Sequence, residues 1–567
     1  MRRRTRYLLV IIVLLIIGGL IVRVRRGPSI QKGSYLVLDI GGPYAEEAPE
    51  DLLGHLLSRR QHTLIDLLSM IRIAQADARI AGMIARIRLL ETGWAKAQDI
   101  RDALVQFKTS GKPLLALLEQ EASGSNMEYY LATVADKIYL APNVAAPLNG
   151  LSSNFVFLGG VWEKLDIQMT VEKIRDYKTA GDMLANKEMT AAHREMANWL
   201  LDSVEAQFVD GLAEGRHLDP AAVRAIIDKC PISPADFEAA GLSNGTRYLE
   251  DVHAELGGEQ APLVEMKDYE QVTATSVGLD VGPEIGIVYG VGVIVTGESG
   301  TGMQGQSLGA DTVIEALQDA AKDDEIRAIV FRVDSPGGSA LASDLVWRAT
   351  QDARKKKPVI VSMSDVAGSG GYYVATGANW IVAQPGTLTG SIGVVSARPN
   401  VKGFLKRLGI NTETISRGTF AELNDLTTVL TPQGRRKLIN EIDFIYSVFV
   451  DRVSSGRNLS VTQVDQLGGG RVWTGAQAKQ NGLVDELGGF TTAIQAAKRV
   501  AKIEPTQEVH LVFYPRRKGI IERLGELANG ATAIELPRDW QNAIRLLVLP
   551  FDQGTLLTLM PESIEIH

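Results

Sequence analysis

An internal duplication constrains the fold of this 567-residue chain more than any other feature. The matching pairs are Lys112-Pro113-Leu114-Leu115 with Lys357-Pro358-Val359-Ile360, Tyr129-Tyr130-Leu131-Ala132 with Tyr372-Tyr373-Val374-Ala375, Pro142 with Pro385, and Gly241-Leu242 with Gly482-Leu483. The offset drifts slowly from 245 to 241 residues, which is typical of a duplicated domain with small insertions. We therefore predict two homologous units, 33–271 and 282–500, a linker at 272–281 and a C-terminal extension at 501–567.

Each unit alternates apolar, β-branched runs with amphipathic stretches at helical spacing. In the second unit we expect strands at 285–294, 328–333, 359–363 and 380–383, and helices at 339–356 and 433–457. Alternation of this kind is typical of parallel sheets with crossover helices, so the predicted class is α/β. The hydrophobic content of 45% is ordinary for domains with large cores. The extension ends in an apolar run near 556–560, for which the residues indicate no function.

The first 26 residues have the pattern of a signal anchor. An uncharged run at 7–22 has arginines on both sides, at positions 2, 3, 4 and 6 and at 23, 25 and 26. Its 16 residues span roughly 24 Å as a helix, and snorkelling arginines can extend a short span. A cleaved signal peptide is the alternative, but no small-x-small site follows the run. The N-terminal arginine excess favours a cytoplasmic N-terminus, so we expect a single-pass protein of a bacterial inner membrane with a periplasmic body.

Charge and cysteine content exclude several classes of function. The net charge is −8, which gives no support for a nucleic-acid partner. Cys230 is the only cysteine, so neither an intramolecular disulfide nor a cysteine-based zinc site can form. The only Gly-Lys pair, Gly111-Lys112, lacks the first glycine of an ATP-binding loop. We expect no cofactor and no metal, and substrates that are short or already unfolded.

The candidate nucleophile lies in the stretch 359–371, where an apolar run leads into Gly368-Ser369-Gly370-Gly371. This pattern predicts a buried strand, a tight turn at Ser369 and a helix beginning near Gly370. A second turn, Asp334-Ser335-Pro336-Gly337-Gly338-Ser339, follows the strand expected at 328–333. Either turn alone is most simply an ordinary Gly/Ser turn. On adjacent parallel strands, the two could offer Ser369 Oγ as nucleophile and the N–H groups of Gly338 and Gly370 as an oxyanion hole.

The base that would activate Ser369 is not an obvious histidine. The seven histidines lie outside the Gly-rich turns and outside the matched core of the second unit: His55, His62, His193, His217, His253, His510 and His567. The Gly-x-Ser-x-Gly elbow of α/β-hydrolases is also absent, since Ala367 stands at its first glycine. The sequence alone leaves a distant histidine possible.

The repeat shows which unit can carry the nucleophile. The first unit has Asn126 where the second has Ser369, and Glu128 where the second has Gly371. Its counterpart of the second glycine-rich turn, near 89–94, contains a single glycine. We therefore expect the first unit to be catalytically silent at this position.

A lysine shows the opposite distribution. Lys178 lies in the stretch 175–180 of the first unit, and the aligned stretch 417–421 of the second unit has no lysine. A lysine acts as a base only when neutral, which requires burial or nearby cations to lower its pKa from about 10.4. Most lysines remain on the surface, but an interface between two large units could bury Lys178.

These motifs together resemble the signal peptide peptidase A family (SppA, protease IV) in its long, duplicated Gram-negative form. They are Asp334-Ser335-Pro336-Gly337-Gly338, Ala367-Gly368-Ser369-Gly370-Gly371-Tyr372-Tyr373, Leu388-Thr389-Gly390-Ser391-Ile392-Gly393, and Tyr177-Lys178-Thr179-Ala180. The resemblance covers the anchor and both units, and is weakest after residue 500. It implies tandem ClpP/crotonase-like domains and a serine protease.

The resemblance also implies roles for particular residues. Ser369 would be the nucleophile, Lys178 the general base, and Ser391 a hydrogen-bond partner that orients the lysine. Gly338 and Gly370 would supply the oxyanion N–H groups. The implied substrates are released signal peptides and other short apolar peptides, and the implied assembly is a dome-shaped homotetramer at the inner membrane.

Two functions of other classes compete with this interpretation. A crotonase-type acyl-CoA enzyme shares the glycine-rich oxyanion loops, but the anchor and the pair Ser369 and Lys178 argue against it. A non-catalytic membrane scaffold would resemble the first unit, but the joint presence of Ser369, Lys178 and Ser391 argues against that as well.

Overall fold

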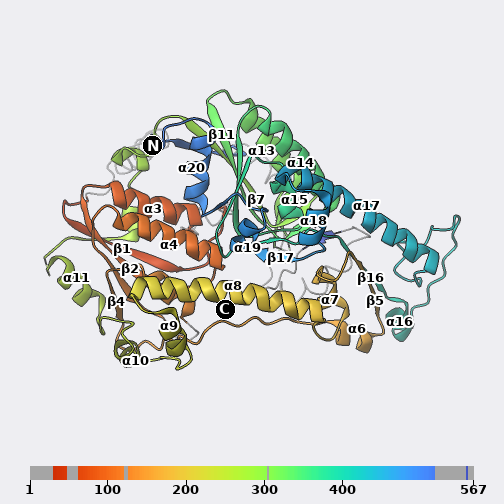
Figure 1. Ribbon diagram of the computed structural model, residues 1–567, viewed down its shortest axis with the longest axis horizontal. Coiled ribbons are helices and arrows are strands. Elements are labelled where there is room, and N and C mark those ends of the chain that lie inside the picture. The colour runs from red at the N-terminus through yellow and green to blue at the C-terminus, as the bar shows by residue number, and fades with distance from the viewer. Residues whose placement is uncertain are drawn as a thin grey trace, which may run out of the picture.

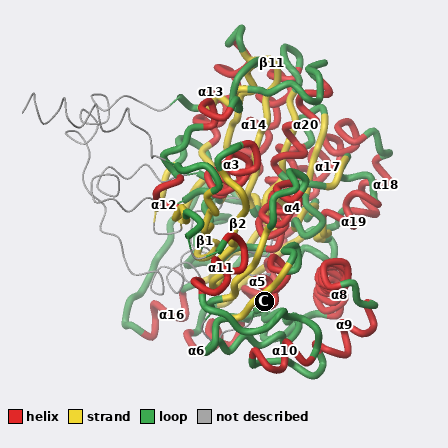
Figure 2. Tube along the Cα trace, turned by 90° about the vertical axis from the view of Figure 1, so that its left-hand side faces the viewer, coloured by secondary structure: helices red, strands yellow, loops and turns green. Residues whose placement is uncertain are grey.

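The computed structural model describes residues 30–47, 62–120, 125–258, 260–302 and 305–516, and the backbone of 557–559. The predicted anchor at 1–26 lies outside these residues. Within the described ranges, no helix is both long enough and apolar enough to cross a membrane. Figure 2 shows strands through the middle of the molecule, with helices around them.

The first unit is built on a five-stranded parallel sheet of order β4-β3-β2-β1-β6. Its strands are β1 (Ser34–Gly42), β2 (Ile80–Leu90), β3 (Leu114–Leu118), β4 (Lys137–Leu140) and β6 (Leu263–Glu265). The helices that connect the first four strands are α3 (Leu64–Ala76), α4 (Trp94–Lys108) and α5 (Asn126–Ala132). This strand–helix alternation is the α/β pattern predicted from the sequence.

The second unit repeats this architecture in a sheet of order β17-β15-β13-β11-β7-β19, with β14 also paired to β13. Its strands are β7 (Glu284–Val291), β11 (Ile326–Ser335), β13 (Val359–Gly368), β14 (Trp380–Ala383), β15 (Leu388–Gly390), β17 (Val472–Thr474) and β19 (His510–Tyr514). β19 pairs with β7, so the predicted C-terminal extension at 501–567 contributes a strand to this sheet. Its principal helices are α13 (Ala310–Lys322), α14 (Ala340–Arg354), α15 (Gly370–Ala375), α17 (Pro432–Arg457) and α20 (Phe490–Val500). The predicted run at 285–294 divides, because the chain turns at Gly292 and continues as β8 (Val293–Val295).

A third sheet joins the two units. Its order is β5-β16-β20-β12-β8-β10-β9. β5 (Gln168–Lys173) comes from the first unit. The other strands not yet described are β9 (Gly300–Gly302), β10 (Gly305–Gly309), β12 (Gly337–Ser339), β16 (Val395–Asn400) and β20 (Leu557–Leu559). β5 pairs antiparallel with β16, and the two lie side by side in Figure 1. This pairing brings the chain that follows β5 to the second unit.

The two units also share apolar packing. Buried side chains of α3 and α4 belong to the same core cluster as Val330, Ile360 and the buried face of α20. The 26-residue helix α8 (Ala191–Arg216) runs along both units (Figure 1), and its Trp199 carbonyl accepts a hydrogen bond from Gln477 in the second unit. The packed apolar side chains at this interface therefore shield the polar groups within it from solvent.

Candidate active site

Ser369 occupies the turn between strand β13 and helix α15. Its backbone has φ 53° and ψ −112°, a positive-φ conformation that is uncommon for residues other than glycine. The Ser369 N–H donates to Gly390 O at 2.8 Å, and its carbonyl accepts from Tyr373 N at 2.8 Å. The residue is fully buried. Hydrogen bonds on both sides thus hold Ser369 in a strained conformation ahead of the helix N-terminus.

The nucleophile turn packs directly against the second glycine-rich turn. Strands β11 and β13 are parallel neighbours, with Ser335 opposite Ala367. A Cβ at Gly371 would lie 2.6 Å from Ser335 O, so only glycine allows this approach. Gly370 is the first residue of α15, and Gly338 lies in β12 on the neighbouring turn. The structure therefore brings together the two turns that the sequence analysis singled out.

Lys178 reaches this turn from the first unit, on the loop between β5 and α7 (Ala180–Ala185). Its Nζ lies 2.7 Å from Ser369 Oγ and 3.0 Å from both the carbonyl oxygen and Oγ of Ser391. All three residues are fully buried, and burial holds the pKa of Lys178 well below its ordinary value. In the described part of the chain, Lys178 is the one titratable side chain hydrogen-bonded to Ser369 Oγ, and the contact forms within a single chain.

Residues that the sequence analysis did not identify fix the backbone of this lysine. Gly470 approaches so closely that a Cβ there would lie 2.4 Å from Lys178 Cα. Next to it, the Arg471 guanidinium lies over the Tyr177 ring at 4.6 Å and over two tryptophan rings, and its carbonyl accepts the Ser391 N–H at 2.8 Å. These contacts join stretches almost 300 residues apart, so no local sequence signal could have indicated them.

The C-terminal extension enters the same region. Residues 557–559 form β20, which pairs antiparallel with β12 (Gly338 opposite Thr558) and with β16 (Val395 opposite Leu557). β20 thus lies between β12 of the second glycine-rich turn and β16, the strand that pairs with β5. The apolar run near 556–560 was visible in the sequence, but its pairing partner was not.

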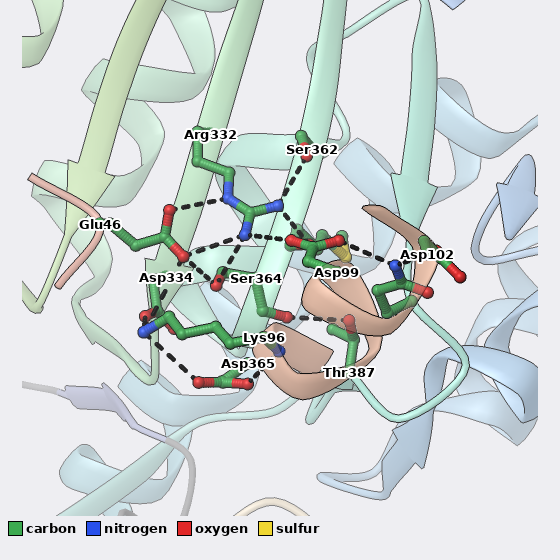
Figure 3. Close-up of polar contacts among 12 residues, drawn as sticks. Glu46, Lys96, Asp99, Asp102, Arg332, Asp334, Ser362, Ser364, Asp365 and Thr387 are labelled. Atoms are coloured by element: carbon green, nitrogen blue, oxygen red, sulfur yellow. Dashed lines mark hydrogen bonds and ion pairs between the residues drawn. The ribbon is translucent and has the colours of Figure 1, made fainter. Parts of the chain in front are cut away.

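A buried network of charges joins side chains of the two units (Figure 3). Arg332 on β11 is fully buried, with its guanidinium 2.9 Å from Glu46 and 2.9 Å from Asp99. Lys96 of α4 lies 2.8 Å from Asp334. The sequence analysis missed this network, because its members are single charged residues with no common motif.

A serine on a strained strand-to-helix turn in an α/β sheet, with a buried amine beside its hydroxyl, defines a serine hydrolase. Peptidase family S49 matches the chain twice, at residues 106–260 and 351–504. The chain belongs to this family, in duplicated form, and is a serine protease. The two matches and the mixed α/β architecture fit a duplicated ClpP-like fold.

Relatives with similar sequences cover most of the chain. It is 35% identical over 496 residues to "Serine protease SPPA, chloroplastic" of Arabidopsis thaliana, covering 86% of this chain and 72% of the relative. It is 29% identical over 529 residues to "Protease 4" of Salmonella typhi, covering 88% and 83%. It is 30% identical over 474 residues to "Protease 4" of Haemophilus influenzae, covering 80% and 75%.

Proposed function

We propose that this protein is a membrane-anchored serine endopeptidase that degrades released signal peptides with a Ser369–Lys178 dyad. The observation that carries the dyad is the distance of 2.7 Å between Lys178 Nζ and Ser369 Oγ in a fully buried site. An exposed lysine would be protonated at neutral pH, and burial removes the solvation that the ammonium needs. Lys178 can therefore be the neutral base that the serine requires.

The three polar contacts of Lys178 match the bonding capacity of a neutral amine. Two N–H groups can donate to the carbonyl oxygen and Oγ of Ser391, and the remaining lone pair can accept the Ser369 O–H. Ser391 would thus orient the lone pair toward the nucleophile. Without it the amine could rotate away, so Ser391 is a positioning residue in this proposal.

The reaction follows from this geometry. Ser369 Oγ attacks the peptide carbonyl as its proton passes to Lys178 Nζ, and the N–H groups of Gly338 and Gly370 stabilise the oxyanion. Lys178 then gives the proton to the leaving amine, and an acyl-serine remains. A water molecule that gives a proton to Lys178 then attacks this ester, the peptide leaves as a carboxylic acid, and Lys178 returns the proton to Ser369 Oγ.

β20 shows that the side of β12 away from β8 pairs with an extended segment. A strand laid antiparallel to β12 at Gly338 has its backbone next to a residue proposed for the oxyanion hole. Peptides that add a strand to a sheet edge bind mainly through backbone hydrogen bonds, which suits substrates of varied sequence. An anchor at 1–26 would hold this site at the inner membrane, where signal peptides are released.

Two segments outside the three sheets support the homo-oligomeric part of the proposal. Within the chain, β5 pairs with β16, and the repeat offset maps these strands onto 411–416 and 152–157. Neither counterpart belongs to a strand of the three sheets, and Ile415 is 89% exposed. We propose that 411–416 of one copy pairs with 152–157 of the next, which closes a ring such as the family's tetramer. Sedimentation of the full chain in detergent checks this, and a monomer would contradict it.

Substitution of Ser369 tests the central proposal. In purified full-length protein, Ser369→Ala should abolish cleavage of apolar peptides, because no other oxygen replaces the nucleophile. A serine-directed covalent probe should label one site per chain, at Ser369. Ser447→Ala is the control, because its hydroxyl bonds only within its own helix, to Phe444 O. Full turnover by Ser369→Ala, or stoichiometric labelling within 33–271, would contradict the proposal.

A further inference from the structure

Lys96 of the first unit contacts both strands that lead into the glycine-rich turns of the second unit. We propose that Lys96 is a positioning residue that clamps the nucleophile turn and the oxyanion turn in their relative placement. This inference rests on the proposed function, since it assigns the two turns their catalytic roles. In the described part of the chain, the Lys96 side chain forms no hydrogen bond or ion pair with Ser369 or Lys178.

Lys96 joins one carboxylate from each strand that leads into a turn. Its Nζ lies 2.8 Å from Asp334 at the end of β11 and 3.4 Å from Asp365 on β13, as Figure 3 shows. Glu46 lies farther away, at 3.8 Å. The Lys96 side chain is 11% exposed, so these ion pairs are only weakly screened by solvent. One ammonium therefore links two strands whose carboxylates would otherwise repel each other.

The two carboxylates hold equivalent positions relative to the turns. Asp334 lies four residues before Gly338, and Asp365 lies four residues before Ser369. Asp334 also accepts the N–H of Val366 at 3.1 Å, which connects the end of β11 directly to β13. Only four residues of backbone separate each carboxylate from its turn, so a shift of the carboxylate would also shift the turn.

Asp365 is tied to the first unit a second time, through the N-terminus of α4. Its carboxylate accepts the N–H of Gly93 at 3.1 Å and the N–H of Lys96 at 3.0 Å. The N-cap of α4 is Gly93, which has no side chain to supply this bond. The nucleophile strand thus caps a helix of the other unit, which fixes the direction from which Lys96 approaches.

The balance of charge explains why the lysine is needed. Two buried cations, Arg332 and Lys96, face four carboxylates: Glu46, Asp99, Asp334 and Asp365. Burial raises the pKa of Asp334, and Lys96 opposes that rise. Burial alone would lower the pKa of Lys96, but the surrounding carboxylates outweigh it and raise the value. Removal of the ammonium would leave Asp334 and Asp365 adjacent without a counter-charge.

The residues of this clamp are divided between the two units, as the residues of the dyad are. The helix starts, Trp94 and Ala340, align Lys96 with Ala342 in the second unit. Asp334 aligns with Leu89 in the first unit at the offset of 245 residues. The lysine is present only in the first unit and its nearest carboxylate only in the second, so neither unit can form this ion pair alone.

Steady-state kinetics of purified full-length variants test this proposal. Lys96→Met should lower kcat by about 10- to 100-fold with KM within about threefold, because displaced turns impair the chemical step more than peptide binding. Lys108→Met is the matched control, since Lys108 is on the same helix but pairs with Asp136 of its own unit. It should leave kcat within about twofold of wild type.

A double-mutant cycle separates positioning from general stability. Asp334→Asn keeps an oxygen for the Val366 N–H but removes the closest charge on Lys96. In that background Lys96→Met should cost less than about threefold in kcat, because the pair is already broken. A wild-type kcat in Lys96→Met, or a further tenfold loss in the Asp334→Asn background, would overturn the proposal. The Asp334→Asn background also serves if Lys96→Met alone does not fold. Inactivity of the wild-type chain would instead refute the proposed function.

Discussion

The two units contain the same strand-to-helix turn in two different states. In the second unit, Ser369 stands ahead of helix α15 at φ 53°, with its hydroxyl against Lys178. In the first unit, the aligned Asn126 is already the first residue of helix α5, and its amide donates to Asn149 Oδ1 at 3.0 Å and Gly150 O at 2.8 Å. Where the second unit has the Ser369 hydroxyl, the first unit thus has an amide whose N–H groups are hydrogen-bonded to the neighbouring loop.

The residue two positions later differs just as sharply. Gly371 lets the Ser335 carbonyl approach the turn, whereas the aligned Glu128 accepts the N–H of Leu90 at 2.8 Å. Leu90 is the last residue of β2, as Ser335 is of β11. The same junction therefore holds a close backbone contact in one unit and a carboxylate in the other. The first unit lacks the serine and the close glycine of this turn, but contributes Lys178 and Lys96 to contacts with the second unit.

The strongest test of this division of labour is Lys178→Arg. Arginine keeps the positive charge but does not deprotonate, so kcat should fall by about 10²- to 10⁴-fold, nearly as far as in Lys178→Ala. KM should change little, since a base acts on the chemical step. Lys173→Arg is the control, because Lys173 lies on the same segment but pairs with Asp182. Substantial activity in Lys178→Arg would remove the first unit from the chemistry.

The pH profile of the wild type belongs to the same test. Burial lowers the pKa of Lys178, and the neutral amine is the active form. The rate should therefore rise with pH through that lowered pKa and be lost as the amine is protonated at lower pH. A histidine base would give the same direction of change, so persistence of the profile in variants of His193, which is buried in the first turn of α8, would argue against this histidine as the base.

A smaller effect is expected from Gly470→Ala, which adds one methyl group at the seam between the units. The new Cβ would lie 2.4 Å from Lys178 Cα, so the lysine backbone must move. Misplacement of a catalytic group by about 1 Å can cost about 100-fold, and we expect a 10- to 100-fold loss of kcat. Gly482→Ala is the control, because only Leu459 lies near its added Cβ, at 3.9 Å. Equal kinetics of the two variants would show that the loop tolerates movement.

The sequence revealed the parts of the site that a comparison of the two repeats brings out, and missed most of those that depend only on contact between the units. Alternating patterns predicted the parallel strands around Ser369, and the comparison of aligned positions singled out Lys178. The same comparison could have flagged Lys96, but a lone lysine on an amphipathic helix is usually solvated. Arg471 and the pairing of 557–559 had no signal at all, because their partners are fixed only by the packed interface.

The smallest expected effect concerns stability of the silent unit, in Glu128→Gln. Burial outweighs the N–H bonds that Glu128 accepts and raises its pKa to about 6. As pH rises from about 4.3, the unfolded chain ionises first while the folded protein keeps its proton, so stability falls until about pH 6 and is constant above it. Glutamine cannot ionise and can still accept the Leu90 N–H. The free energy of unfolding of the variant should therefore exceed that of wild type by about 1–2 kcal/mol at pH 7, which raises its unfolding temperature. At pH 4 the two should be equally stable, and kcat should be unchanged. A loss of stability at pH 7 would mean that the fold stabilises the ionised carboxylate and lowers its pKa, and a loss of kcat would mean that the first unit's turn still takes part in the chemistry.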